Sequence, residues 1–107
     1  RQDYSDADLM AIAGLLLDAQ QYRFSAGAEQ AFAEYIALRR QLPFFANARS
    51  IRNAIDRARL RQANRLFARM AEALTRDDLI TIEAPDIRAS RVFSGQVEGH
   101  HPVASGA

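Results

Sequence analysis

The chain has 107 residues, of which 49% are hydrophobic and 25% are charged, so it can bury the core of one compact domain. It contains no cysteine, which excludes disulfides and thiolate metal sites, and its net charge of +1 is far from that of a typical nucleic-acid binder. No apolar run approaches the roughly 20 residues needed to cross a bilayer, so we expect neither a membrane nor a nucleic acid as partner. Because the sequence opens on Arg1 and not on methionine, we expect a piece of a longer protein.

Two helices are predicted in the first part of the chain. Ser5 followed by Asp8 is a capping pattern, and the apolar residues behind it repeat at helical spacing, which predicts a helix over residues 5–20. Ser25 can cap a second helix over residues 25–42, which ends just before a proline. The apolar faces of these helices consist of Leu9, Ile12, Ala13 and Leu16, and of Ala28, Phe32, Tyr35, Leu38 and Leu42.

The third predicted helix is the longest, over residues 47–73, with Asn47 as its N-cap. At about 100° per residue, its apolar residues form two stripes about a quarter turn apart. The first stripe, which should pack against the first two helices, consists of Ile51, Ala54, Ile55 and Ala58. The later stripe consists of Ala63, Leu66, Phe67, Met70 and Leu74. Two offset stripes indicate two partners, so we expect the later stripe to be only partly covered, in part by a C-terminal helix that carries Ile87 and Val92.

Shorter elements are predicted after the third helix. Thr75 with Asp78 offers a cap for a short segment, and residues 79–83 alternate in the manner of a brief extended piece. A proline suits the first turn of a last helix over residues 85–92. Glycine, serine, histidine and proline dominate residues 94–107, which predicts a flexible tail. The expected fold class is therefore all-α, a small helical bundle of three main helices plus a short C-terminal helix.

The sequence carries no catalytic motif of its own. Because it has no lysine, it has no G-x-x-x-x-G-K-[ST] loop and cannot bind and hydrolyse a nucleotide unaided in the P-loop manner. There is also no G-x-S-x-G and no H-E-x-x-H motif. The adjacent histidines at 100–101 offer too few ligands for a metal, and helix capping explains the acid pairs Asp6/Asp8 and Asp77/Asp78. We expect no catalytic residue and no metal site.

Arg49 and Arg52 are the candidate binding residues. They lie three residues apart in the first turns of the third helix and should point away from the stripe of Ile51 and Ile55, beside helix N–H groups that favour anions. Two guanidinium groups in that place can grip a phosphate. The alternative is a solvated face on which Arg52 forms a weak ion pair with Asp56.

More arginines follow on the same helix, and they point in many directions. They are Arg57, Arg59, Arg61, Arg65 and Arg69. A nucleic-acid binder would prefer a single basic face. The spread therefore favours solvated surface or salt bridges between subunits.

Part of the third helix resembles a known family. The stretch ANARSIRNAIDRARLRQANRLF is similar to the C-terminal helical lid of CbbX-type AAA+ proteins, the red-type Rubisco activases. The segment YSDADLMAI resembles the opening of that lid, and LITIEAPDIRASRVF resembles its closing helix. The resemblance covers residues 4–93 and implies a lid subdomain over residues 1–93. It also implies that Arg49, in the Asn-Ala-Arg element, is the sensor-2 residue that contacts the nucleotide phosphates, with Arg52 as the second choice.

The same resemblance implies the activity of a longer protein. That protein would be an ATP-driven hexamer that remodels inhibited red-type Rubisco so that tight-binding sugar phosphates leave. ATP with Mg would bind the full-length protein, and no nucleotide is expected on the chain alone. The implied partners are the AAA+ core subdomain, neighbouring subunits and the Rubisco large subunit. The implied location is the bacterial cytoplasm, or the plastid in algal relatives.

Two departures limit what the resemblance carries over. Phe44 stands where many relatives have histidine, which affects local packing. The Walker A and B motifs, the pore loops and the sensor-1 residue are all absent from this sequence. Two alternatives therefore stay open: the lid of another AAA+ remodeller of the same clade, and a free-standing helical module that binds nucleic acid or protein.

Overall fold

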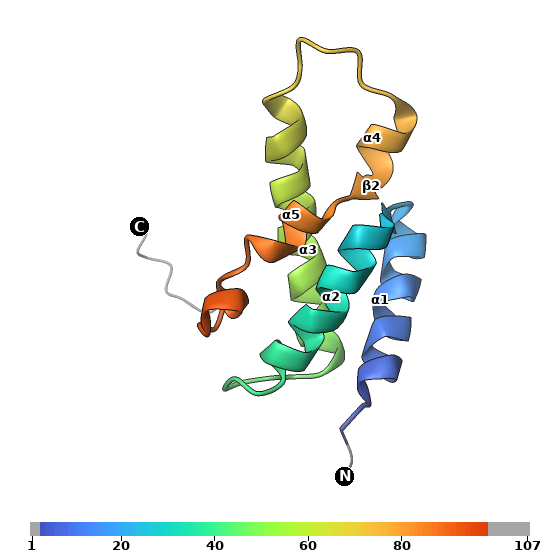
Figure 1. Ribbon diagram of the computed structural model, residues 1–107. Helices are drawn as coiled ribbons and strands as arrows, with labels where there is room; N and C mark the ends of the chain where they lie inside the picture. The colour runs from blue at the N-terminus through green and yellow to red at the C-terminus, as the bar shows by residue number, and fades with distance from the viewer. Residues whose placement is uncertain (1–2, 99–107) are drawn as a thin grey trace.

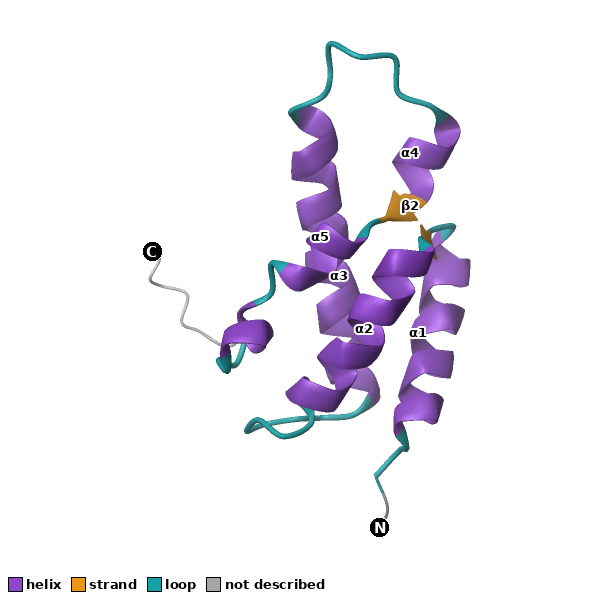
Figure 2. Ribbon diagram, viewed as in Figure 1, coloured by secondary structure: helices purple, strands orange, loops and turns teal. Residues whose placement is uncertain are grey.

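Three long helices dominate the computed structural model, which describes residues 3–98 (Figure 1). They are α1 (Asp6–Gln20), α2 (Ala26–Arg39) and α3 (Ala48–Phe67). The shorter elements are β1 (Arg23–Phe24), α4 (Arg76–Ile80), β2 (Thr81–Ile82), α5 (Ala84–Arg88) and the 3-10 helix η1 (Arg91–Ser94). Figure 2 shows how little of the described chain is strand, so the all-α prediction is confirmed. Within residues 3–98, no helix combines the length and apolar character that a membrane span requires.

The first two helices begin where their capping residues predict. The Asp8 amide donates to Ser5 Oγ at 3.0 Å, and the Ser5 amide donates to the Asp8 carboxylate at 3.2 Å, which completes a capping box. The Ala28 amide donates to Ser25 Oγ at 3.1 Å at the start of α2. α1 ends at Gln20, and its C-cap, Gln21, adopts a left-handed conformation with φ of 62°.

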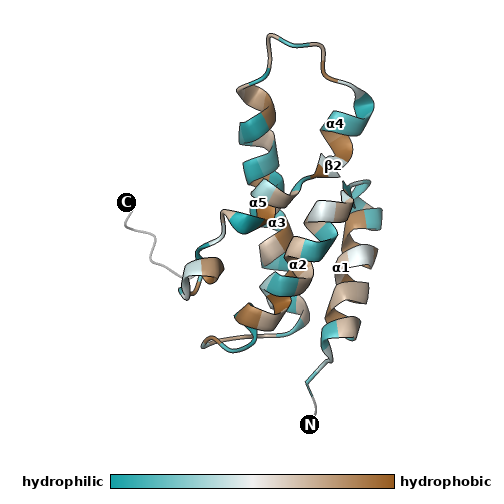
Figure 3. Cartoon of the chain, viewed as in Figure 1, coloured by the Kyte–Doolittle hydropathy of each residue, from teal (hydrophilic) through white to brown (hydrophobic). Residues whose placement is uncertain are grey.

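The core lies where α1, α2 and α3 converge. α1 packs against both α2 and α3, and α5 packs across α2 and α3, as the crossing in Figure 1 shows. In Figure 3 hydrophobic and hydrophilic residues alternate along α2 and α3, as expected for helices with one buried face. The largest fully buried apolar side chains are Phe32, Leu9, Ile36, Ile51, Ile55, Ile82 and Val92. Leu38 was predicted for the buried face of the second helix, but it is exposed, and Ile36 is buried in its stead.

Two short strands join distant parts of the chain. β1 and β2 pair in parallel, with Arg23 opposite Thr81, and the Ser25 amide donates to the carbonyl of Ile82 at 3.0 Å. The predicted extended piece at 79–83 is therefore real but shorter. Its first two residues belong to α4, because the capping box of Thr75 makes the chain helical up to residue 80.

Three predicted helix ends need correction. α2 ends at Arg39 and not at 42, because the chain turns through tight bonds such as Leu42 N to Arg39 O. α3 ends at Phe67 and not at 73, since the amides of Arg69, Met70 and Glu72 bond to carbonyls only three residues back. The predicted last helix at 85–92 is split into α5 and η1, because Ser90 is extended and its hydroxyl caps the Val92 amide.

Candidate functional site

The start of α3 differs in detail from the predicted cap. Asn47 does precede the helix, but its side chain makes no capping bond, and its backbone has φ of 49° and ψ of −120°. Its Oδ1 accepts a bond of 3.4 Å from the Tyr4 amide instead. The hydroxyl of Ser50 fixes the preceding loop by accepting the Ala46 amide at 2.8 Å. The helix start is therefore set by long-range contacts and by Ser50, and not by an N-cap side chain.

The directions predicted for the first turns of α3 are confirmed. Ile51 and Ile55 have no exposed surface and Ala58 is 1% exposed, while Arg49 and Arg52 are both exposed. Both residues are described by the structure, and neither has an ion-pair partner within 4.0 Å among residues 3–98. The ion pair between Arg52 and Asp56 that the alternative interpretation predicted is therefore not formed within the described residues of the structure.

Arg49, but not Arg52, lines a hollow at this end of the molecule. The hollow has a volume of about 190 Å³ and is lined by Arg39, Phe44, Ala46, Arg49, Ser50, Asn53, Val97 and Glu98. A smaller neighbouring hollow is lined by Tyr35, Arg39, Ser50, Asn53, Arg57 and Glu98. Three arginines and one carboxylate thus surround this space, which leaves it cationic. Burial raises the pKa of the Tyr35 hydroxyl to about 12, so it stays a neutral donor.

Glu98 brings the C-terminal segment back to α3. Its carboxylate pairs with Arg61 at 2.5 Å and accepts the Arg91 amide at 3.3 Å. The described chain therefore contacts the helical body beyond the predicted lid boundary at 93. The remaining residues of the predicted tail, 99–107, lie outside the described residues, as do the two histidines at 100–101.

The later arginines were predicted as solvated surface or inter-subunit bridges, and the structure corrects this for Arg59, Arg61 and Arg65, which make contacts within the chain. Arg59 lies 4.5 Å from the centroid of the Tyr22 ring. Arg65 forms a two-point ion pair with Asp86, from Nε to Oδ1 at 2.9 Å and from the second nitrogen to Oδ2 at 2.8 Å. This hydrogen bonding raises the pKa of Arg65. Arg61 donates to the Asp86 carbonyl. Arg69, just beyond the end of α3, donates to Glu72 in an exposed pair, as expected of solvated surface.

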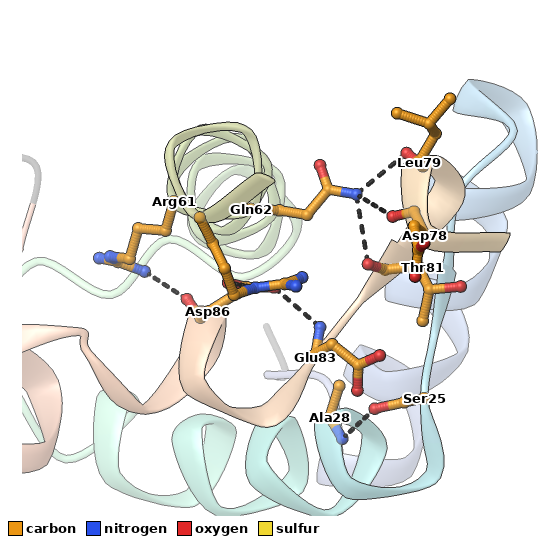
Figure 4. Close-up of polar contacts among 10 residues, drawn as sticks. Ser25, Ala28, Arg61, Gln62, Asp78, Leu79, Thr81, Glu83 and Asp86 are labelled. Carbon is orange, nitrogen blue, oxygen red and sulfur yellow. Dashed lines mark hydrogen bonds and ion pairs between the residues drawn. The ribbon is translucent and has the colours of Figure 1, made fainter. Parts of the chain in front are cut away.

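One buried amide was missed by the sequence-based prediction. Gln62 is 2% exposed, and its Nε2 approaches the carbonyls of Asp78, Leu79 and Thr81 at 3.3, 3.0 and 3.2 Å (Figure 4). These carbonyls end α4 and begin β2, where backbone acceptors lack helical partners. Figure 4 shows Gln62 and Arg61 on different sides of α3, with Gln62 reaching the end of α4 and Arg61 reaching Asp86 in α5. Together these contacts attach α4 and α5 to α3. Apolar periodicity carries no signal for such contacts.

The later apolar stripe is divided between buried and exposed residues. Leu66 is 6% exposed, whereas Phe67 and Met70 are 72% and 63% exposed. Met70 and Leu74 lie beyond the end of α3, so they do not continue its face as predicted. Leu60, which is 63% exposed, lies two turns before Phe67 on the same side of the helix. Leu60 and Phe67 therefore leave an exposed apolar patch on α3, which we call the α3 patch.

One acid of each predicted pair serves as a cap, Asp8 for α1 and Asp78 for α4. Asp6 instead pairs with Arg40, and Asp77 lies 3.9 Å from Arg23. The carboxylate of Asp78 accepts the Thr75 amide at 2.9 Å, and this bond is the first cause of the lowered pKa of Asp78. Among residues 3–98, no three His, Asp or Glu side chains gather in a way that could hold a metal.

Comparison with known proteins gives a consistent set of relatives. A family model described as the AAA lid domain matches residues 5–94. Protein CbbX of Cereibacter sphaeroides is 55% identical over 102 residues, which are 95% of this chain and 33% of that protein. The chloroplastic ribulose bisphosphate carboxylase/oxygenase activase of Cyanidioschyzon merolae is 53% identical over 91 residues, 85% of this chain and 31% of its own. Protein CfxQ of Xanthobacter flavus is 53% identical over 96 residues, 90% of this chain and 30% of its own. The chain spans about a third of the length of these relatives.

Proposed function

The chain belongs to the AAA lid domain family, among the lids of CbbX and CfxQ proteins, and from this premise we propose that it senses ATP for a larger AAA+ ATPase that remodels Rubisco. The clients would be inhibited red-type Rubisco complexes, from which tight-binding sugar phosphates are released. The name of the algal relative, a Rubisco activase, supports this choice of client. ATP with Mg would bind mainly to the larger core subdomain, in a hexamer and in the bacterial cytoplasm.

Arg49 is the residue that we propose for nucleotide sensing. The single observation that carries the proposal is its exposed position in the first turn of α3, beside a cationic hollow. A guanidinium in that position can reach a β- or γ-phosphate when the lid closes, and its permanent charge would stabilise phosphate charge. Arg52, also exposed, is the second choice. Binding would then couple the nucleotide state to the angle of the lid.

The α3 patch is the surface that we propose for contact with the rest of the ATPase. Exposed apolar side chains that gather in one place are typical of surfaces that another protein covers. Leu60 and Phe67 are both more than three-fifths exposed. The occupant would be the core subdomain or a neighbouring subunit.

The test compares Arg49→Ala with Arg52→Ala in the full-length protein. Loss of a charge-assisted bond to phosphate, worth about 1.5–3 kcal/mol, should weaken ATP binding in Arg49→Ala by roughly tenfold to a hundredfold. Steady-state ATPase activity, hexamer assembly and reactivation of inhibited red-type Rubisco should fall with it. Thermal unfolding of the lid should stay nearly unchanged, because the side chain points away from the core. The chain alone should bind ATP weakly or not at all, since it lacks a phosphate-cradling loop.

Normal ATP turnover and assembly in Arg49→Ala would show that the assignment is wrong. A large loss of lid stability in that variant would instead show that the arginine is structural. If ATPase activity depends on Arg49 but red-type Rubisco is not reactivated by the parent protein, the nucleotide role stands and the client is another protein.

A further inference from the structure

The loop that joins α2 to α3 has a conformation that its own residues do not favour. Two residues that are not glycine have positive φ, Phe44 at 69° and Asn47 at 49°. Asparagine adopts positive φ more readily than most residues, but a bulky aromatic residue rarely does. Such a conformation persists only where surrounding contacts hold it. The contacts that hold this loop therefore decide where α3 begins.

Arg39 makes the central contact from the α2 side. It is the last residue of α2, and only 6% of its surface is exposed. One guanidinium nitrogen donates to the carbonyl of Pro43 at 3.0 Å and approaches the carbonyl of Leu42 at 3.4 Å. Its central carbon lies 5.7 Å from the centroid of the Phe45 ring. A buried charge therefore contacts three positions of the loop, residues 42, 43 and 45.

The loop passes this constraint directly to the first turn of α3. The Ala46 amide donates to the hydroxyl of Ser50 at 2.8 Å, and the Ala46 carbonyl accepts the Arg49 amide at 3.1 Å. Ala46 follows immediately on the segment that Arg39 holds. Arg39 and Arg49 also line the same hollow, so a shift of the loop changes both the backbone and the surroundings of Arg49.

We infer that Arg39 is a positioning residue for ATP sensing: it holds residues 42–46 in the strained conformation that aims Arg49 at the nucleotide. The inference rests on the proposed function of Arg49. A lysine cannot replace Arg39 here, because the planar guanidinium can lie against a ring while it donates to backbone carbonyls, whereas an ammonium is a strongly hydrated point charge. Arg39 does not itself contact the phosphates in this mechanism. It acts through Arg49.

A double-mutant cycle in the full-length protein tests this coupling. The four proteins are the parent, Arg39→Lys, Arg49→Ala and the double variant, and the measurement is the Kd for ATP by titration with a fluorescent ATP analogue. Arg39→Lys should weaken ATP binding about tenfold when Arg49 is present and should have no further effect when Arg49 is alanine. The matched control is Arg88→Lys. Arg88 pairs with an acid of α2, Glu34, and lies 5.6 Å from the centroid of the Phe93 ring, but these partners are outside the loop, so ATP affinity should stay within about twofold of the parent.

The outcomes separate the inference from the function on which it rests. If Arg49→Ala binds ATP as the parent does, the proposed function is wrong. If Arg49→Ala weakens binding but folded Arg39→Lys does not, only the inference is wrong. Equal weakening by Arg39→Lys in both backgrounds also overturns it, because a general loss of structure does not depend on Arg49. Thermal unfolding of each protein shows whether it folds. If Arg39→Lys does not fold, Arg39→Gln, which keeps an amide donor, replaces it in the cycle.

Discussion

The two halves of α3 hold the rest of the molecule by different kinds of contact. In the N-terminal half, residues 48–58, an apolar stripe is buried against the bundle and the opposite side carries the exposed Arg49. In the C-terminal half, residues 59–67, polar side chains hold the segment from α4 to residue 98. Hydrophobic contact is non-directional and depends on buried area, whereas hydrogen bonds depend on geometry. The first half can therefore hold Arg49 on a packed helical body, as its proposed role requires, and the second half attaches the return segment in one specific register.

The largest effect is expected from Ile55→Ala, in the N-terminal half. Ile55 has no exposed surface, so truncation should leave a cavity and destabilise the chain by about 2–5 kcal/mol. The measurement is urea or guanidinium unfolding followed by circular dichroism. Leu60→Ala is the matched control, because Leu60 belongs to the same helix but is 63% exposed, and it should cost no more than about 0.5 kcal/mol. Equal losses in the two variants would contradict the conclusion that Ile55 is buried in the core while Leu60 lies on the surface of α3.

The same contrast explains which parts of the fold the sequence could predict. Apolar periodicity predicted the burial of Ile51 and Ile55, and the same angular spacing predicted the exposure of Arg49. Both properties depend only on positions within one helix. Gln62 has its partners 16 to 19 residues away, and no local pattern reports them. Arg39 was not predicted as buried either, since a charged residue is seldom buried unless the tertiary fold supplies acceptors.

Helix ends show the same limit. The caps at Ser5 and Ser25 were predicted because the bonds that define them span three residues. The end of α3 at Phe67 was missed because the sequence continues in good helix formers, while the contacts that hold the returning chain, such as the pairing of β2 with β1, come from distant residues. The candidate site was predicted as an exposed arginine pair, but its hollow needs residues from three separate segments.

A smaller but clear effect is expected from Arg65→Met, in the C-terminal half. Asp86 is 2% exposed, and the variant would leave its carboxylate buried with the Glu83 amide as its remaining hydrogen-bond donor within residues 3–98. Breaking a fully buried pair costs about 3–5 kcal/mol. Because the Arg65 side chain is 27% exposed and partly screened by water, we expect about 1–3 kcal/mol in chemical unfolding.

Arg69→Met is the matched control for that experiment. Arg69 lies one turn later, and its partners Glu72 and Asp78 are more exposed than Asp86, so the loss should be under about 1 kcal/mol. If Arg65→Met costs no more than Arg69→Met, the polar contacts of the C-terminal half do not stabilise the fold as argued.

The smallest effect is expected from lowering the pH, which should weaken the cap of α4 at Asp78. The carboxylate of Asp78 accepts the Thr75 amide, and this bond lowers the pKa of Asp78 below its ordinary value of 3.8. A folded-state pKa below the unfolded one means that the cap stabilises α4 fully above pH 3.8 and that this stabilisation is lost as the pH falls through the lowered pKa. In an NMR titration the chemical shift of the Thr75 amide should therefore change with a midpoint below pH 3.8. The amide signals of buried α1 residues should keep their native shifts at that pH. Asp78→Asn should abolish that titration, because the amide side chain has no proton to gain. A midpoint at or above 3.8, or simultaneous loss of the α1 signals, would show that α4 is not a locally capped element held apart from the core.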